Sequence, residues 1–178
     1  MSNEEALNAA IEELCADNTE EMQKGIGTAL TAIFEKGMTP QDAFGISDAT
    51  IDLLYRKAYL LYNSGHYIEA SRIFRALILL NVTEMKYTLG LAGCFHMLKE
   101  YGNAAQAYVR CSLIDAESPI PYYHAYDCFM HLNDPVSAAV VLQLAIDKAG
   151  DKPLYAVIKQ RCELSLQQIK GELNEIGK

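Results

Sequence analysis

Apolar side chains of similar size recur at a fixed spacing of 34 residues between positions 51 and 149. A small residue is followed four positions later by a bulky one, and three positions after that by another apolar one. These columns contain Ala70, Ala104 and Ala138, then Phe74, Tyr108 and Leu142, then Leu77, Cys111 and Ala145. The alignment needs no gap, which indicates three consecutive copies of one structural unit.

A 34-residue period with these small and bulky columns resembles the tetratricopeptide repeat. Each unit would then be two antiparallel helices, with the small residue where the two helices cross. One unit cannot bury its apolar face alone, so the units stack. The resemblance predicts an all-α superhelix of three helical hairpins. The consensus proline near the end of each repeat is missing, because Val82 and Ala116 stand in that column of the first two units.

The segments that flank the repeats are also predicted to be helical. Residues 1–36 form an amino-terminal helical region, with a first helix over 4–16 and a second one that starts at Asn18 and ends at Gly37. The apolar stripe of the second helix is expected to mediate weak self-association through Met22, Ile26, Leu30 and Ile33. A capping helix over 153–171 covers the last repeat, with an inner face made of Leu154, Val157, Ile158, Cys162 and Leu166. We expect residues 1–178 to form a single all-helical domain.

Local capping residues place the helix ends. Thr39 and Pro40 open a short helix that Gly45 stops, and Ser47 caps the next helix. Helices are then predicted over 67–80, 85–98 and 101–114. Ser118-Pro119 and Asp134-Pro135 open the two helices of the third repeat, and the chain is expected to fray after Gly171.

The composition narrows the choice of partners. The net charge of −8 and the sequence pI of about 5.0 argue against nucleic acid and against anionic membrane surfaces. The apolar run at 76–80 is too short for membrane insertion. A secretory signal is not expected, because the sequence shows no basic amino-terminal segment followed by an apolar core. The five cysteines form an odd number without CxxC spacing, which favours a reducing cytoplasm.

No motif in the sequence indicates catalysis, a metal or a cofactor. The histidines His66, His96, His124 and His131 lack the spacing of a metal site. The glycines near Ile26, and Gly90 and Gly93, belong to no dinucleotide or phosphate loop, so they are expected to permit close helix packing. We therefore predict a protein that is not an enzyme, with no cofactor and no bound metal.

The first helix of the first repeat carries two stripes. One stripe is apolar and contains Leu54, Ala58 and Leu61. The other contains Tyr55, Tyr59 and Tyr62, whose spacing places all three on one helical face. In a tetratricopeptide repeat this face lines the concave groove, where Gly93 would leave a dent for a ligand backbone. We predict a peptide-binding surface that consists of Tyr55, Tyr59, Tyr62, Leu89, Gly93, His96, Met97 and Tyr123.

Residues 35–150 resemble a particular family. The segments Phe44-Gly45-Ile46-Ser47, 54–65, 74–77 and 87–92 are similar to the class II chaperones of bacterial type III secretion. The resemblance implies a cytoplasmic chaperone of a Gram-negative bacterium that keeps hydrophobic, pore-forming translocator proteins soluble and separate before export. It implies that an extended Pro-x-Leu-x-x-Pro segment lies in the groove against Tyr55, Tyr59 and Tyr62. It also implies a homodimer through the amino-terminal helices.

Three other functions make different demands on the residues of the groove. An adaptor for the carboxyl terminus of a partner needs Lys, Arg and Asn in the groove, where this chain has Tyr55, Tyr59, Leu89, Gly93 and Ile120. A scaffold or co-chaperone for another secretion-apparatus subunit is the main alternative, because an apolar groove also accepts an amphipathic helix. A hydrolase needs convergent acids and bases, and the sequence shows none.

Overall fold

The computed structural model describes the backbone of residues 19–176 and the side chains of residues 24–172. These residues belong to two compact units, one up to Thr50 and one from Ile51. Every regular element within 19–176 is a helix, so the all-α prediction is confirmed. The helix predicted over 4–16 lies outside the described residues. No described helix combines the length and the apolar character that crossing a membrane requires.

The first unit contains α2 (Thr19–Lys36) and α3 (Pro40–Ala43). The helix α2 ends where Gly37 adopts a positive φ of 66°, as the sequence predicts. At α3 the Thr39 hydroxyl accepts a hydrogen bond of 3.1 Å from the Asp42 N–H, and Pro40 occupies the first helical turn. The Ser47 hydroxyl likewise accepts from the Thr50 N–H at 3.2 Å. The predicted capping residues of this segment are therefore confirmed.

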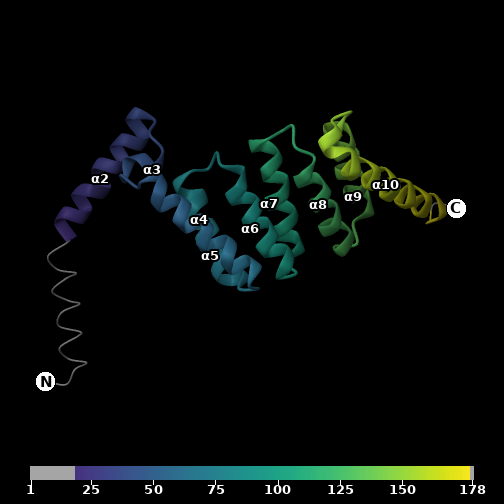
Figure 1. Cartoon of the computed structure of the whole chain (residues 1–178), viewed down its shortest axis with the longest axis horizontal. Helices are drawn as coiled ribbons and strands as arrows, with labels where there is room; N and C mark the ends of the chain where they lie inside the picture. Colours follow the sequence, from purple (N-terminus) through teal and green to yellow (C-terminus); the bar gives the residue numbers. More distant parts are fainter. Residues whose placement is uncertain (1–18, 177–178) are drawn as a thin grey trace, which may run out of the picture. The chain divides into compact units, whose positions relative to one another are not determined.

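Three antiparallel helical hairpins follow (Figure 1). The first pairs α4 (Asp48–Asn63) with α5 (Tyr67–Leu80), the second α6 (Met85–Met97) with α7 (Tyr101–Ile114), and the third α8 (Ile120–His131) with α9 (Pro135–Ala149). These bounds agree with the predicted helices to within one residue. The Asp134 carboxylate accepts from the Ser137 N–H at 3.0 Å, which confirms the predicted start of α9.

The 34-residue columns form the core of the repeats. Ala70, Ala104 and Ala138 are fully buried, and the bulky column of Phe74, Tyr108 and Leu142 is at most 4% exposed. The column that begins with Leu60 behaves differently. Cys94 and Cys128 are fully buried, whereas Leu60 is 67% exposed because no hairpin of this unit precedes α4.

The turn inside each hairpin has the same conformation three times. Gly65, Lys99 and Asn133 stand 34 residues apart, and all three adopt a positive φ, between 55° and 83°. In each turn the next residue donates its N–H to the carbonyl five residues earlier, as Glu100 does to Phe95 at 2.9 Å. This pattern is a Schellman-type helix end, which satisfies carbonyls that the helix leaves free.

Lys99 holds this left-handed conformation with a side chain that disfavours it. We expect Lys99→Gly to raise the free energy of unfolding by about 0.5–1 kcal/mol, since glycine relieves the backbone strain but loses more entropy on folding. The matched control is Lys99→Ala, which keeps the strain and should give no gain. Urea unfolding of both variants tests this, and equal stabilities would contradict the strain argument.

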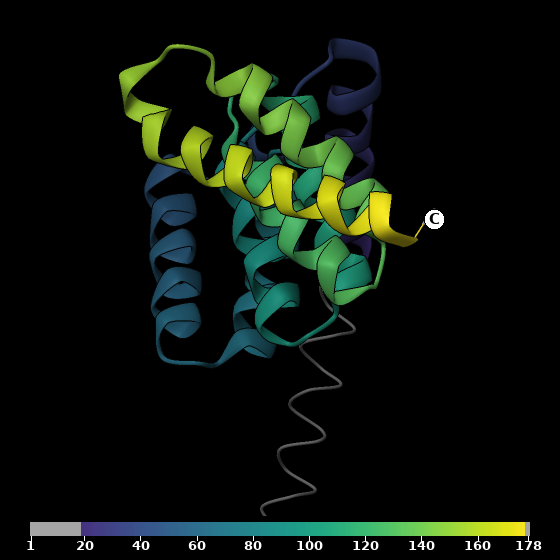
Figure 2. The ribbon, with the colours of Figure 1, turned by 90° about the vertical axis from the view of Figure 1, so that its right-hand side faces the viewer.

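A final helix covers the third hairpin, as predicted (Figure 2). A 3₁₀ turn, η1 (Pro153–Tyr155), leads into α10 (Ala156–Ile176). Cys162, Leu166 and Ile169 are at most 5% exposed and pack against a cluster that includes Ala138 and Leu142.

The predicted inner face of this helix is wrong at two residues. Leu154 is 82% exposed and Val157 is 63% exposed. Leu154 lies in the 3₁₀ turn, which has three residues per turn, so it is out of phase with the inner face of α10. Val157 lies within α10 itself, and its spacing of nine residues from Leu166 places the two on opposite faces of that helix. Ile158, Cys162 and Leu166 do face the third hairpin. The helix also continues beyond Gly171, where the sequence analysis expected fraying.

Candidate functional site

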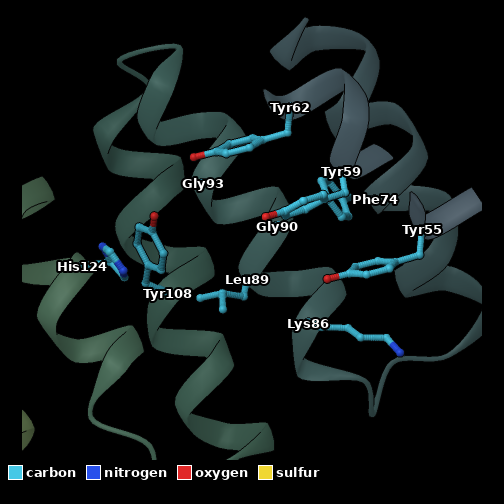
Figure 3. Close-up of a pocket in the computed structure, with 10 residues that line it drawn as sticks. All are labelled: Tyr55, Tyr59, Tyr62, Phe74, Lys86, Leu89, Gly90, Gly93, Tyr108 and His124. Carbon is cyan, nitrogen blue, oxygen red and sulfur yellow. The ribbon is translucent and has the colours of Figure 1, made fainter. Parts of the chain in front are cut away.

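An apolar hollow of about 260 Å³ lies within the compact unit that begins at Ile51 and contains the repeats. Its walls come from α4, α5, α6, α7 and α8 (Figure 3). The lining residues are Tyr55, Tyr59, Tyr62, Phe74, Lys86, Leu89, Gly90, Gly93, Tyr108 and His124. The hollow therefore spans the first two repeats and the start of the third.

The tyrosines of α4 form one wall. Figure 3 shows the rings of Tyr55, Tyr59 and Tyr62 as successive rungs whose hydroxyls extend toward the hollow. The rings of Tyr55 and Tyr59 are stacked, with centroids 6.5 Å apart and planes 27° apart. Tyr59 is 53% exposed, whereas its neighbour Ala58 is fully buried. The two faces that the sequence predicts for this helix are thus both present.

The base of the hollow depends on a glycine. Phe74 of α5 is 2% exposed, and its ring meets Tyr55 edge-on at 6.2 Å. A Cβ atom at Gly90 of α6 would lie only 2.4 Å from the Phe74 ring. Gly90 therefore allows α6 to pack directly on Phe74, as the sequence analysis expected for this residue.

A side chain of the protein itself lies in the space beside Gly93. A Cβ atom at this position would lie 3.3 Å from the Tyr62 ring and hydroxyl, so the Tyr62 side chain already covers the space. The Tyr62 ring also meets Tyr67 at 5.4 Å. Burial, and to a smaller extent the neighbouring Cys94 thiol, raises the pKa of the Tyr62 hydroxyl. Gly93 therefore accepts the Tyr62 ring in the free protein, and the approach of a ligand backbone at this position stays a prediction.

One end of the hollow carries a cation. The Lys86 ammonium lies 5.2 Å from the centre of the Tyr55 ring and 5.3 Å from that of Tyr87, both within cation–π range. It also lies 3.5 Å from a Glu84 carboxylate oxygen. The described lining contains no carboxylate, so apart from this ammonium the wall suits an uncharged ligand.

The wall opposite the tyrosines consists of Tyr108 and His124. Their rings are stacked at 5.3 Å with planes 21° apart, and Tyr108 is only 4% exposed. Burial raises the pKa of the Tyr108 hydroxyl. Burial also lowers the pKa of His124, with a smaller contribution in the same direction from His96, while Asp127 opposes it. At neutral pH His124 is therefore uncharged.

The structure brings five of the eight predicted residues into the lining: Tyr55, Tyr59, Tyr62, Leu89 and Gly93. His96, Met97 and Tyr123 are not part of it. The Nε2 atom of His96 is 2.8 Å from an Asp127 carboxylate oxygen, and the same oxygen is 3.7 Å from Nε2 of His131. The contact between Asp127 and His131 was not predicted, although the two residues are one helical turn apart.

The other lining residues, Phe74, Lys86, Gly90, Tyr108 and His124, were missed as site residues. Phe74 and Tyr108 share a repeat column, so the pattern assigned both to packing between helices. Their rings are nevertheless large enough to be buried and to present one edge to the hollow. A signal was present in Tyr108 and His124, two polar aromatic residues in a region of apolar packing, but their contact depends on the fold.

Metal and thiol chemistry find no support in the described residues. Among residues 24–172, no group of three or more His, Cys, Asp or Glu is arranged to hold a metal ion. Cys94 and Cys128 are fully buried, and burial raises the pKa of each thiol to about 11. Both are therefore protonated at neutral pH and unreactive as nucleophiles.

The helical hairpins define a tetratricopeptide-like scaffold with an aromatic hollow, and comparisons with known proteins identify its family. No protein-family model matches the chain. The chain is 30% identical over 125 residues to low calcium response locus protein H of Yersinia pseudotuberculosis. The aligned region covers 70% of this chain and 74% of the relative.

Two solved structures are similar as well. A type III secretion complex from Aeromonas hydrophila is 27% identical, with a TM-score of 0.76 over 82% of this chain and 97% of that one. The Yersinia enterocolitica chaperone SycD, solved with a peptide of the translocator YopD, is 29% identical, with a TM-score of 0.68 over 71% of this chain and 97% of that one. The chain belongs to the class II chaperones of type III secretion, the translocator chaperones.

Proposed function

We propose that this chain binds a hydrophobic translocator protein through the hollow and keeps it soluble before export. The observation that carries the proposal is the wall of Tyr55, Tyr59 and Tyr62 above an apolar base. The similarity to SycD, which was solved with a translocator peptide, supports the same ligand class. As in its chaperone relatives, the role is binding rather than catalysis, and we place it in the bacterial cytoplasm.

The tyrosine spacing favours an extended ligand over a helical one. In an extended peptide, side chains on the same face are two residues, or about 6.6 Å, apart. The ring centroids of Tyr55 and Tyr59 are separated by nearly the same distance, 6.5 Å. Successive tyrosines can thus contact alternate residues of one strand, with hydroxyls free to bond its backbone. A Pro-x-Leu-x-x-Pro segment fits, since proline favours an extended backbone and the leucine can enter the hollow.

The eight residues predicted to bind a peptide fall into two groups, those in the lining of the hollow and those outside it. Tyr55, Tyr59, Tyr62 and Leu89 are proposed as direct contacts, and Gly93 contributes by accepting the Tyr62 ring. A role for His96, Met97 and Tyr123 stays a prediction, because these residues lie outside the lining. A longer segment that continues past the hollow would reach them.

Calorimetry with synthetic peptides tests the proposed function. We expect a Pro-x-Leu-x-x-Pro peptide to bind the full chain. Replacing its leucine by aspartate should weaken binding strongly, because the hydrophobic contact is lost and a carboxylate must give up its water in a mostly apolar hollow. Equal binding of the two peptides would overturn the proposal. Stronger binding of an amphipathic helical peptide would favour the scaffold alternative.

The first unit is proposed to mediate weak self-association. Along α2, Ile26 and Leu30 are 43% and 44% exposed, and Phe34 is 82% exposed, although the sequence analysis did not include it. Ile33 is partly buried, and the Met22 side chain lies outside the described set. Such an apolar stripe is typical of a helix that packs on another copy.

Charged residues in this stripe should therefore prevent association. We expect the double variant Ile26→Asp, Leu30→Asp to have the mass of a monomer in light scattering at concentrations where the unmodified chain associates. Thr28→Asp is the matched control, because Thr28 lies on another face of the same helix. If the double variant and the unmodified chain have the same mass, the assignment of the interface is wrong.

A further inference from the structure

His124 introduces a titratable group into a hollow that is otherwise suited to uncharged side chains. Among the described lining residues it is the only one whose ordinary pKa lies close to neutrality. It faces the hollow from α8, on the wall opposite the tyrosines (Figure 3). A proton on His124 would therefore change the charge of the surface that contacts the ligand.

The surroundings of His124 favour the neutral ring. The imidazole stacks on Tyr108 of α7 and meets the Tyr123 ring at 5.6 Å. No residue of α9 or α10 lines the hollow. The titratable and charged groups that face His124 or share its hollow are Tyr55, Tyr59 and Tyr62 of α4, Lys86 and His96 of α6, Tyr108 of α7, and Tyr123 and Asp127 of α8.

The carboxylate that opposes this effect, Asp127, contacts two other histidines. Asp127 has an oxygen 2.8 Å from His96 and 3.7 Å from His131. In the part of the chain that the structure describes, His124 contacts no carboxylate, whereas His96 and His131 both contact Asp127. A protonated His124 would thus remain a poorly compensated charge on the wall of the hollow.

We propose that His124 makes ligand binding pH-sensitive: the neutral ring accepts an apolar segment in the hollow, and the imidazolium weakens its binding. This inference rests on the proposed function of the hollow. A bound segment removes water from His124 and so penalises its charged form further. The complex then holds the proton less readily than the free protein, and the affinity falls as His124 becomes protonated.

The sign of the effect follows from the pKa of the free protein. Burial places the pKa of His124 below its ordinary value of 6.5, and ligand binding lowers it more. Affinity should therefore be constant from pH 8 to about pH 6.5 and decrease below that range. Between pH 7.5 and pH 5.0 we expect the dissociation constant to rise by roughly threefold to tenfold, since each unit of pKa difference corresponds to a factor of ten.

The experiment uses the full chain and a Pro-x-Leu-x-x-Pro peptide with blocked ends and no ionisable side chain, so only the protein can titrate. Calorimetry gives the ratio of the dissociation constants at pH 5.0 and pH 7.5. Circular dichroism at each pH verifies that the chain is folded. His124→Gln should reduce this ratio to about one, whatever its affinity at pH 7.5. The matched control His66→Gln changes an exposed histidine in the α4–α5 turn and should keep the ratio.

A proton NMR titration of the histidine rings provides a second readout. The pKa of His124 should be lower in the peptide complex than in the free chain, while the ring signals of His66 should be unaffected by the peptide. A ratio near one in the unmodified chain, or a retained ratio in His124→Gln, would overturn the inference while leaving the proposed function intact. Absence of peptide binding at every pH would overturn both.

Discussion

Tyr59→Ala is expected to bind a Pro-x-Leu-x-x-Pro peptide about thirtyfold more weakly than the unmodified chain, while its melting temperature stays nearly the same. Tyr59 is the middle rung of the tyrosine wall, so a bound segment would desolvate it most. Truncation of such a central aromatic anchor typically costs about 2 kcal/mol or more of binding free energy, and 2 kcal/mol corresponds to roughly thirtyfold in affinity.

The free energy of unfolding should change little in this variant. The Tyr59 side chain is 53% exposed in the free protein, and its main contact is the stacked ring of Tyr55. Loss of such a partly exposed aromatic pair costs about 1 kcal/mol, which shifts the melting temperature by about 2–4 °C in a chain of this size. The packing between α4 and its neighbours depends instead on Ala58, which is fully buried.

Two further variants separate binding from folding. Leu60→Ala removes an exposed side chain next to Tyr59 that does not line the hollow, so it should bind the peptide normally. Ala70→Leu overpacks a fully buried helix crossing and should lower the free energy of unfolding by about 1–3 kcal/mol. If Tyr59→Ala binds as tightly as the unmodified chain, or loses binding only because it unfolds, the tyrosines belong to the core.

The repeat architecture was predictable because its signals are local and repeated. The alanine column at Ala70, Ala104 and Ala138 marks helix crossings that are fully buried in all three hairpins. Capping residues such as Thr39 and Asp134 fix helix starts through hydrogen bonds to their own neighbours. Such interactions depend on spacing along the chain, so one sequence is enough to place them.

The shared turn conformation was less visible, because Gly65, Lys99 and Asn133 have little in common as side chains. The same backbone hydrogen bond closes all three turns within their hairpins, and it overrides the preference of Lys99 for other conformations. The phase of α10 was hidden for a related reason. A single 3₁₀ turn at Pro153–Tyr155 leaves Leu154 in solvent, and periodicity alone does not reveal that turn.

The candidate site was predictable on the α4 side only. Tyr55, Tyr59 and Tyr62 share one helix, so their common face follows from helical geometry. The opposite wall joins Tyr108 of α7 to His124 of α8, and this contact exists only after two repeats have stacked. The same holds for Tyr62 on Gly93, where a side chain from the first repeat fills the space that a glycine in the second repeat leaves open.

Gly90→Ala provides the sharpest test of how the hollow is built. In most helices alanine in place of glycine stabilises by about 1 kcal/mol. Here the new Cβ atom would lie 2.4 Å from the ring of Phe74, which is itself buried and unable to move freely. Overpacking of this kind costs about 1–3 kcal/mol. We therefore expect a lower free energy of unfolding, measured by urea denaturation, despite the better helix propensity of alanine.

Gly171→Ala is the matched control, because a Cβ atom at this exposed position of α10 meets nothing within 4 Å. It should stabilise the chain by about 0.5–1 kcal/mol. The decisive measurement is Gly90→Ala in a Phe74→Leu background, which lacks the two ring atoms closest to the new methyl group, both at 2.4 Å. In that background the sign should reverse, and the alanine should be neutral or stabilising. If Gly90→Ala destabilises both backgrounds equally, α6 does not depend on close contact with Phe74, and the base of the hollow is held by other residues.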